Sequence, residues 1–591
     1  MSTFGDSIEG IFDGLHQEAQ KSKFAGGLGM DVTNFRAANS NISTTGGVVP
    51  GAVYFWKLFN DMLVAVNQSG KRRGSGCLYL ETWHHDIEAF LNFKKNSGDD
   101  RIRGHDINTA NWIPDLFIKQ VIADENWYLF SPDEVPDLHD LYGAAFEKRY
   151  WEYVKKGKKG QLKLFQEVSA KELWKKMLKM LFETGHPWVT FKDPSNFRYS
   201  NQHVGVVHSS NLCTEILLHT KATTYEPNND RKIDEYGETA VCNLGSVNLK
   251  NHLDEEQNID FDKLQDTVHL AMRALDNVID INFYPTQESK LSNTRHRPVG
   301  LGSMGWHDLF FAKGIGYDSP EAFEISDRLY EFISYHAILA SSNLAKERGH
   351  YSTYEGSLWS DDKLPIDTYC SFMNDHRDAD GLQPEQFTTL DWQVVRDSIK
   401  KNGMRNSNTM AIAPNATISR IAGCSSCTEP YYNNIFARSS QDGDFTVVNE
   451  WLVKLLKEKD SWNHDTINKL KLTDGDVFKA DLPLTDDEKE LFKNAFQVDQ
   501  IELLKAAAAR GRWIDQGMSV NLFNDKTSLK FLHEMYVTAW QLGLKTTYYL
   551  RSKGASQIEK STVQVEKEQV IGDLNGVQAC SIDNPECESC Q

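Results

Sequence analysis

Two spacings of apolar residues alternate along this chain. From Trp112 to about Phe191, apolar residues recur every three or four positions, which predicts mostly helix. The same spacing predicts helices over 318–348 and most of 452–511, and Asp6 or Ser7 is suited to cap a helix at the start. Short apolar runs bounded by glycine or polar residues predict strands at 78–80, 210–218, 240–245, 295–302, 543–551 and the first part of 407–421.

One predicted strand, Ser210 to Leu218, carries three reactive side chains. In a strand, alternate side chains share a face, so Asn211, Cys213 and Glu215 would project together, roughly 7 Å apart. A thiol beside a carboxylate can carry out redox or radical chemistry while the carboxylate moves a proton and the amide orients a substrate. The alternative is that Cys213 is a small buried hydrophobic residue, as most free cysteines are.

Other chemically useful residues lie on neighbouring predicted strands. A hairpin-like return would bring Cys242 next to the first strand, so the two cysteines can share a pocket. Tyr548 and Tyr549 are adjacent in the predicted strand 543–551. Adjacent tyrosines usually serve packing, but oxidisable phenols can also pass an electron and a proton in steps.

Three polar or glycine-rich turns are candidates for ligand binding. Gly27 lies in a glycine-rich turn where a ligand can approach the backbone, although a plain tight turn explains it equally well. The loop 68–76 carries three cations that suit a phosphate or nucleotide, unless it is only a solvated surface loop. At a predicted helix start, free backbone N–H groups with Asn415, Thr417 and Ser419 favour an anion such as phosphate.

The composition changes after about Ser552. The last segment is rich in Gln, Glu, Lys, Ser and Val without apolar periodicity, which predicts a flexible tail over 552–591. It ends in Cys587-x-x-Cys590, and a mobile dithiol can enter a site, exchange with a disulfide and swing out to be reduced again. Alternatively, this pair and Cys424 with Cys427 form a four-cysteine zinc site in a binding protein.

Overall composition excludes several classes of protein. The 591 residues have a formal net charge of −19 and no long block of like charge, which argues against nonspecific nucleic-acid binding. No run of about 18 apolar residues predicts a membrane span, and the first residues do not resemble a secretory signal. Nine cysteines are too few for a disulfide scaffold. The chain is therefore expected in the cytoplasm (of a host cell if it is viral), with reduced thiols.

Taken in order, these segments resemble the large, catalytic subunit of class I ribonucleotide reductase, nearly continuously from Asp6 to Gln591. A further signature begins at Trp392, with Val395 where the family usually has Leu or Phe. The resemblance rests on the segments 211–215, 240–244, 392–414, 543–551 and 587–590. It implies the ten-stranded α/β barrel of that family over residues 1–551, incomplete in this chain, with the radical site on a central finger loop, and a redox tail over 552–591.

The resemblance also implies residue roles in reducing ribonucleoside diphosphates to 2′-deoxyribonucleoside diphosphates for DNA synthesis. Cys213 would become a thiyl radical that takes the 3′ hydrogen, Glu215 would accept the 3′-hydroxyl proton, and Asn211 would hold the sugar hydroxyls. Cys242 would be one of two cysteines that reduce the substrate. The other implied roles are a radical relay by Tyr548 and Tyr549, and re-reduction of the active-site disulfide by Cys587 and Cys590, themselves reduced by thioredoxin or glutaredoxin.

Further implied sites bind substrate and effector. The substrate-binding residues would be Gly27, Arg72, Asn211, Glu215, Asn415, Ala416, Thr417, Ile418 and Ser419. The residues binding a dNTP or ATP effector with Mg²⁺ would be Asp6, Ser7, Ile8, Arg36 and Gln68. No metal is expected on this chain itself, because the radical would come from a small subunit with a dinuclear metal and a tyrosyl group.

Two departures from the family pattern affect these expectations. The long amino-terminal part of family members, often with an ATP-binding cone, has no counterpart here, and no cysteine precedes Cys77. The disulfide partner of Cys242 is therefore expected on a separate amino-terminal polypeptide, in a split large subunit that forms a homodimer once completed. The competing explanation is that the chain is an inactive remnant or a truncated piece of a longer subunit. The alternative for its function is a catalytically silent scaffold of the same fold that binds nucleotides.

Overall fold

The computed structural model describes residues 1–42, 44–67, 73–226, 232–377, 387–440, 443–526 and 528–552. Several residues with expected roles lie outside these ranges: Gln68, Arg72, Cys587 and Cys590. Their expected roles therefore stay predictions.

The first half of the fold is a parallel sheet. Its order is β1-β2-β3-β4-β7, with each neighbour pair parallel. Every residue of β3 and β4 is buried, as expected for parallel strands covered on both faces. The strands are β1 (Ser2–Thr3), β2 (Gly27–Asp31), β3 (Ser75–Glu81), β4 (Asn108–Ile113) and β7 (Trp188–Phe191).

The second half is built from shorter pieces that also run parallel. β10 (Leu244–Asn248) pairs with β11 (Gly300–Met304), and β14 (Leu522–Asn524) pairs with β15 (Leu550–Ser552). Between them, single parallel bridges join Leu301 to Met410 and Ile412 to Met518. The predicted strand at 543–551 is therefore assigned as strand only near its end, and the predicted strand at 240–245 begins at Leu244, after Cys242.

Backbone hydrogen bonds join the two halves in antiparallel orientation. Thr190 in β7 forms an antiparallel bridge with Thr546. At the other edge, Met1 and Ala240 exchange two backbone hydrogen bonds, of 2.8 and 3.0 Å. Two parallel halves joined in this way make an α/β barrel. The expectation that barrel strands are missing ahead of residue 1 stays a prediction.

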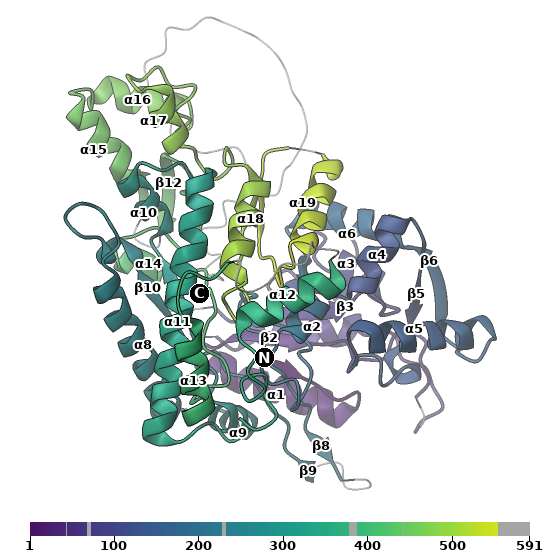
Figure 1. Cartoon of the computed structure of the whole chain (residues 1–591). Helices are drawn as coiled ribbons and strands as arrows, with labels where there is room; N and C mark the ends of the chain where they lie inside the picture. Colours follow the sequence, from purple (N-terminus) through teal and green to yellow (C-terminus); the bar gives the residue numbers. More distant parts are fainter. Residues whose placement is uncertain are drawn as a thin grey trace, which may run out of the picture.

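Helices enclose the barrel, and the long helix α11 (Pro320–Arg348) packs against α8, α13 and α18 (Figure 1). The helices expected at 318–348 and at the start of the chain are confirmed, and Ser7 caps α1 by accepting from the Gly10 N–H at 3.0 Å. The remaining α-helices are α1 (Ile8–Lys23), α2 (Val53–Ala65), α3 (Ile87–Asn92), α4 (Asp115–Ala123), α5 (Gly143–Lys158), α6 (Ala170–Thr184), α7 (Lys192–Phe197), α8 (Phe261–Ile281), α9 (Gln287–His296), α10 (Trp306–Lys313), α12 (Pro365–His376), α13 (Trp392–Asn402), α14 (Ile418–Ile421), α15 (Glu450–Glu458), α16 (His464–Leu472), α17 (Asp486–Leu491), α18 (Gln500–Gly511) and α19 (Leu529–Gln541).

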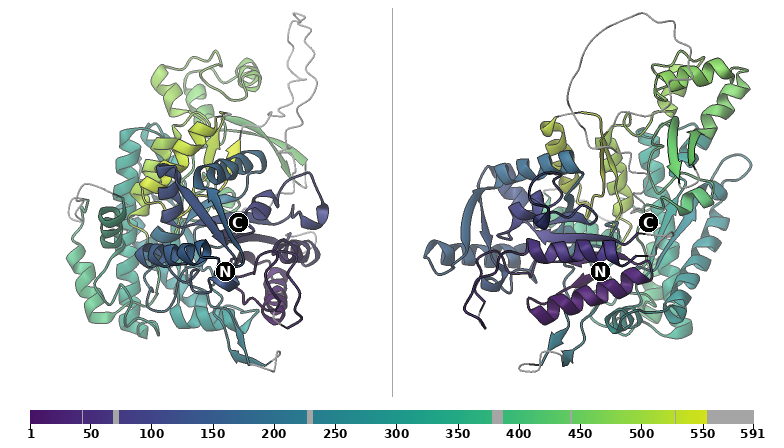
Figure 2. Two further views of the ribbon diagram at one scale, coloured as in Figure 1. Left: turned by 90° about the vertical axis from the view of Figure 1, so that its right-hand side faces the viewer. Right: turned by 180° about the vertical axis from the view of Figure 1, so that it is seen from behind.

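Smaller elements complete the fold. Helices α15, α16 and α17 form a lobe at the top of Figures 1 and 2, with its own apolar cluster around Phe311, Leu452 and Leu470. The β8–β9 hairpin projects from the opposite end (Figure 2). The other elements are β5 (Asn126–Phe130), β6 (Phe165–Ser169), β8 (Thr224–Tyr225), β9 (Ile233–Glu235), β12 (Ile435–Ser440), β13 (Gly443–Val448) and the 3₁₀ turns η1 (Asp100–Ile102), η2 (Pro132–Glu134) and η3 (Leu249–His252).

Candidate active site

The segment from Ser210 to Leu218, called the site loop below, is not the strand that its sequence predicted. It has no ladder partner, and it turns at Leu212 and Cys213. Thr214 has φ +69°, a left-handed conformation that is unfavourable for a β-branched residue. Strain of this kind persists only where surrounding contacts over-determine the backbone, and such positions cluster at functional sites.

Side chains and neighbouring backbone satisfy the polar groups of this buried loop. The Ser210 hydroxyl donates to the Ile216 carbonyl at 2.6 Å, and the Ile216 N–H donates to the Asn211 amide oxygen at 3.2 Å. From the second half of the barrel, the Gly517 N–H donates to the Glu215 carbonyl at 2.8 Å. Since unpaired buried backbone groups are costly, these contacts explain why the loop holds one shape without a ladder.

Cys213 lies at the tip of the loop and is fully buried. The Tyr548 hydroxyl donates to its sulfur at an O–S distance of 3.3 Å. The Ser519 hydroxyl contacts the Cys213 carbonyl oxygen at 2.5 Å. The thiol is therefore in direct contact with an oxidisable phenol that is 335 positions away in the sequence.

Glu215, two residues after Cys213 in the site loop, is a buried carboxyl group. Burial raises its pKa to about 7, while hydrogen bonds from Asn211 and Ser519 act in the opposite direction. The Ser519 hydroxyl lies 3.1 Å from Glu215 Oε2. A carboxyl group with a pKa near neutrality can both accept and return a proton.

Cys242 faces the same region. Burial, together with the charge of Glu215, raises its pKa to about 12, although the amino group of Met1 and a hydrogen bond with Asn211 act in the opposite direction. It forms no disulfide with any cysteine in the described part of the chain. Asn211 thus interacts with both Glu215 and Cys242, and Ser519 connects Glu215 with the Cys213 backbone. A loop rather than strand alternation sets these positions.

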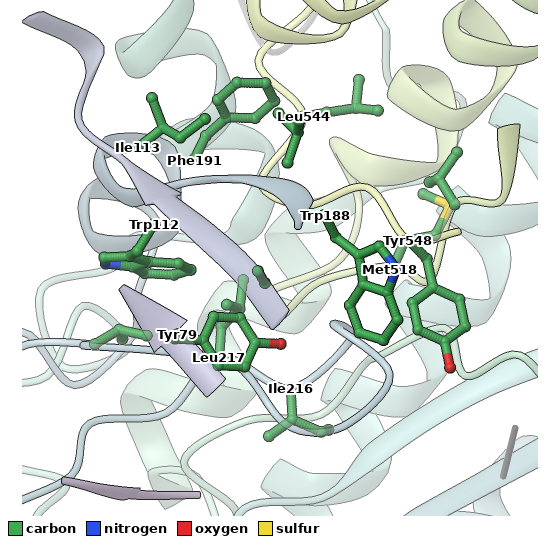
Figure 3. Close-up of a cluster of buried hydrophobic side chains, with 14 of the residues drawn as sticks. Tyr79, Trp112, Ile113, Trp188, Phe191, Ile216, Leu217, Met518, Leu544 and Tyr548 are labelled. Carbon is green, nitrogen blue, oxygen red and sulfur yellow. The ribbon is translucent and has the colours of Figure 1, made fainter. Parts of the chain in front are cut away.

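Two tyrosines and a tryptophan connect Cys213 with the outside. Tyr548 is buried, Tyr549 is partly exposed, and their ring centroids lie 4.3 Å apart. The Trp188 ring lies 4.7 Å from the Tyr548 ring and 4.9 Å from the Tyr549 ring. Figure 3 shows Trp188 beside Tyr548 in one apolar cluster that also includes Ile216 and Leu217 of the site loop.

The expected phosphate-binding segment differs in detail from its prediction. The predicted helix start is the single turn α14, and the Thr417 side chain makes no capping bond there. Asn415 has φ +56°, and its amide contacts Ser246 at 2.9 Å and the Ala413 carbonyl at 3.0 Å. Ser246 follows Cys242 closely in the chain, so the segment lies on the Cys242 side of the barrel. Thr417 and Ile418 are exposed.

The residues expected to bind an effector lie together at the start of α1. Arg36 Nε lies 2.7 Å from Asp6 Oδ2, and the Arg36 N–H donates to the same carboxylate at 3.2 Å. Ser7 caps the helix, and the Ile8 side chain is 59% exposed. The structure thus brings Asp6, Ser7, Ile8 and Arg36 together.

Glycines in β2 allow the site loop to approach the sheet. A Cβ at Gly29 would lie 2.1 Å from the Ser210 carbonyl oxygen, and one at Gly27 would lie 3.0 Å from the Leu212 side chain. Gly27 therefore contacts the loop, which is a packing role beside the expected substrate role. The turn predicted at Gly27 is instead the start of strand β2, and Gly29, two positions further on, lies on the same face of that strand.

Two further contacts were missed because they lie far away in the sequence. Ser519 contacts both Cys213 and Glu215, and the Tyr79 hydroxyl donates to the Asn211 carbonyl at 2.6 Å. Neither residue lies in a recognisable motif. Only the barrel geometry reveals them.

Cys424 and Cys427 show no sign of a metal site in the described part of the chain. In the described residues, three His, Cys, Asp or Glu side chains have ligand atoms within 4.8 Å of one another at only two places. One is formed by Asp31, His139 and His208, and the other by His219, Glu238 and His296. None of the helices in the described ranges combines the length and the apolar character that a membrane span requires.

Comparisons with known proteins agree with this architecture. The family described as "Ribonucleotide reductase, barrel domain" matches residues 1–550. The chain is 46% identical to a ribonucleoside-diphosphate reductase subunit alpha of Chlamydia pneumoniae, covering 100% of this chain and 56% of that protein. It is 37% identical to the large subunits of Arabidopsis thaliana and Monkeypox virus, covering 99% and 98% of this chain and 71% of each relative. The chain thus spans about half the length of its Chlamydia relatives.

Proposed function

The chain belongs to the ribonucleotide reductase family through its barrel domain, and on this premise we propose that it carries the radical site of a ribonucleoside-diphosphate reductase. Its reaction is the reduction of a ribonucleoside diphosphate to the 2′-deoxy form for DNA synthesis. The observation that carries the proposal is the contact of the Tyr548 hydroxyl with the Cys213 sulfur, on the same loop as the buried carboxyl group of Glu215.

In the proposed mechanism, three site-loop residues act on the ribose. Oxidised to a thiyl radical, Cys213 takes the 3′ hydrogen atom and returns it at the end of the cycle. Glu215 accepts the 3′-hydroxyl proton, for which a pKa of about 7 is well suited, and Asn211 holds the sugar hydroxyls. The 2′-hydroxyl leaves as water.

Replacing that hydroxyl by hydrogen consumes two electrons, which two thiols supply as they become a disulfide. Cys242 is one of these thiols. Its partner is a second cysteine thiol, which the split-subunit hypothesis assigns to a separate amino-terminal polypeptide. Cys587 and Cys590 then reduce the disulfide by thiol exchange, and thioredoxin or glutaredoxin reduces them in turn.

The radical reaches Cys213 through Tyr549 and then Tyr548. The 4.3 Å between their ring centroids and the direct contact with Cys213 support this order. The source is a small subunit with a dinuclear metal and a tyrosyl group, which docks where Tyr549 is accessible.

Substrate and effector bind at separate places. Residues 415–419 bind the substrate diphosphate, with Gly27 and Arg72 also near the substrate. The Asp6–Arg36 region and Gln68 bind a dNTP or ATP with Mg²⁺. Exposed apolar side chains on α1 and α2 nearby support a homodimer through this face, namely those of Ile8, Phe12, Tyr54 and Val64. The assembled enzyme works in the cytoplasm.

A CDP reduction assay tests the proposal. The chain is purified with its small subunit and assayed with and without the polypeptide encoded upstream. We expect dCDP only when all three are present, and none with Cys213→Ser, because a serine oxygen does not form the required radical. Effector binding by Cys213→Ser should be unchanged. Absence of turnover in every combination would instead favour the catalytically silent scaffold.

A further inference from the structure

A buried cluster in the first half of the barrel plays no part in the proposed reaction. Asp31 ends β2, His139 lies between η2 and α5, and His208 precedes the site loop by two positions. The ligand-type atoms of the three side chains lie within 4.8 Å of one another. Their exposed fractions are 1%, 2% and 6%.

The orientation of His139 is fixed from two sides. Its Nδ1 lies 2.5 Å from Glu81 Oε1, and its Nε2 lies 2.8 Å from Asp31 Oδ2. Glu81 is held in turn by Lys192 Nζ and by Trp83 Nε1, each at 2.6 Å. A carboxylate on the far nitrogen of an imidazole is the usual arrangement behind a metal-binding histidine, because it fixes the tautomer and raises the basicity of the ligand nitrogen.

His208 is held in the same way. Its Nε2 lies 2.7 Å from Asp140 Oδ1, so that Nδ1 is the nitrogen left available. His208 Nδ1 is buried and has no hydrogen-bond partner among the described residues. The rings of His208 and His139 lie 4.5 Å apart. A buried polar atom without a partner is rare in native proteins and calls for a ligand or a water.

An arrangement without an ion explains only part of this cluster. In such an arrangement, His139 is a cation held between Asp31 and Glu81 by contacts of 2.8 and 2.5 Å. This arrangement still leaves the buried His208 Nδ1 without a hydrogen-bond partner among the described residues. An ion accounts for both histidines.

We propose that Asp31 Oδ2, His139 Nε2 and His208 Nδ1 bind one divalent transition-metal ion, with Zn²⁺ as the ion best matched to two imidazoles and a carboxylate. Zinc takes such ligands at about 2.0–2.2 Å, so the ion would replace the proton now shared by His139 and Asp31, and binding would release that proton. A water molecule would complete a four-coordinate site.

The second buried group of the same type provides a contrast. In it, Arg295 lies 2.7 Å from Glu238 Oε1, which places a permanent cation against the carboxylate. The outer nitrogens of its histidines contact the hydroxyls of Tyr199 at 2.8 Å and Thr353 at 2.7 Å. Neither His219 nor His296 has a buried nitrogen without a partner among the described residues, so that group is complete without an ion.

The proposed ion would have a structural role. It would join three segments that are far apart in the sequence: the end of β2, the segment before α5 and the segment that leads into the site loop. By fixing His208, it would restrict the position of Asn211, three residues further on. Metal binding should therefore stabilise the folded chain as well as the loop.

Metal titration of the full chain tests this proposal. The chain carries Cys587→Ser and Cys590→Ser, so that the tail thiols cannot bind the probe. After chelator treatment it is titrated with Co²⁺, followed by visible absorption, and then with competing Zn²⁺. We expect one equivalent with a spectrum free of thiolate-to-metal bands, and a higher melting temperature on Zn²⁺ addition.

Three variants show which residues bind the ion. His208→Gln should lose binding yet keep the fold, because glutamine can still donate to Asp140 and no bond to Nδ1 is lost. Asp140→Asn should weaken binding about 10–100-fold, the usual cost of losing a partner behind a ligand. His219→Gln, in the contrasting group, should bind normally.

Three results would overturn the proposal. The first is that the chain binds neither Co²⁺ nor Zn²⁺, and the second is that His208→Gln binds the metal as tightly as the parent chain. The third is a spectrum with thiolate bands, which would assign the ion to Cys424 and Cys427. Circular dichroism of the metal-free variants establishes that each is folded.

Discussion

Removing the Ser519 hydroxyl tests how the protein prepares Glu215 to accept a proton. This hydroxyl lies 3.1 Å from Glu215 Oε2 and 2.5 Å from the Cys213 carbonyl oxygen. Donation to the carboxylate stabilises its ionised form and lowers its pKa, against burial. Ser519→Ala removes the donor and leaves the burial, so the pKa of Glu215 should rise.

The size of the effect follows from the geometry. A hydrogen bond to a charged group contributes about 1.5–3 kcal/mol. We take the low end of this range, because the single hydroxyl proton of Ser519 is shared between Glu215 Oε2 and the Cys213 carbonyl oxygen. A loss of about 1.5 kcal/mol corresponds to about one pKa unit. The pKa of Glu215 would then move from about 7 to roughly 8. At pH 7 the ionised fraction falls from about one half to about one tenth, an expected loss of about five-fold in kcat/KM.

The assay is kcat/KM for CDP between pH 6 and pH 9, measured with the assembled enzyme. The acid limb of the Ser519→Ala profile should shift to higher pH. Activity should approach that of the wild type by about pH 9, where Glu215 is ionised in both the wild type and the variant. Ser334→Ala is the matched control, because Ser334 is equally buried and donates to the Trp513 carbonyl at 2.6 Å, away from Glu215. An unshifted limb, or the same loss at every pH, would refute the reasoning.

Three further predictions concern the relay, the tail and the loop. Tyr549→Phe should abolish turnover without weakening substrate binding, measured by equilibrium dialysis, because phenylalanine forms no phenoxyl radical; retained turnover would exclude Tyr549 from the relay. Cys587→Ser with Cys590→Ser should retain turnover with dithiothreitol and lose it with thioredoxin, whereas equal loss with both reductants would contradict the tail role. Gly29→Ala places a Cβ 2.1 Å from the Ser210 carbonyl oxygen of the site loop and should lower the melting temperature and the activity. Gly316→Ala, whose Cβ would have no atom closer than 3.9 Å, should change neither. A Gly29→Ala enzyme with normal stability and activity would show that the loop adjusts freely.

The fold explains why short motifs far apart can cooperate. The site loop lies between the two halves of the barrel and takes hydrogen bonds from both, from Tyr79 in β3 and from Gly517 and Ser519. The backbone of the loop is therefore held from both halves of the barrel. The proposed radical reaction needs short and constant distances between reacting groups, which such a held loop can provide.

The sequence by itself determined the reactive residue types and two of the helices, the one at the start of the chain and the one at 318–348. Local signals are enough for these: Ser7 caps α1 through a residue three positions away, and α11 follows from apolar spacing. The motifs around Cys213, Cys242 and Tyr548 also identified the family without any structure, because their order and spacing are specific.

Tertiary structure alone decided how these residues meet. The apolar run after Cys213 predicted a strand, but the segment pairs with no strand in the described part of the chain, and side chains and a left-handed Thr214 hold it as a loop. Ser519 and the cluster of Asp31, His139 and His208 left no mark in the sequence, since each contact joins positions that are about 70 to more than 300 residues apart. Burial and long-range strand pairing, which no short window of sequence contains, created both the site and its surroundings.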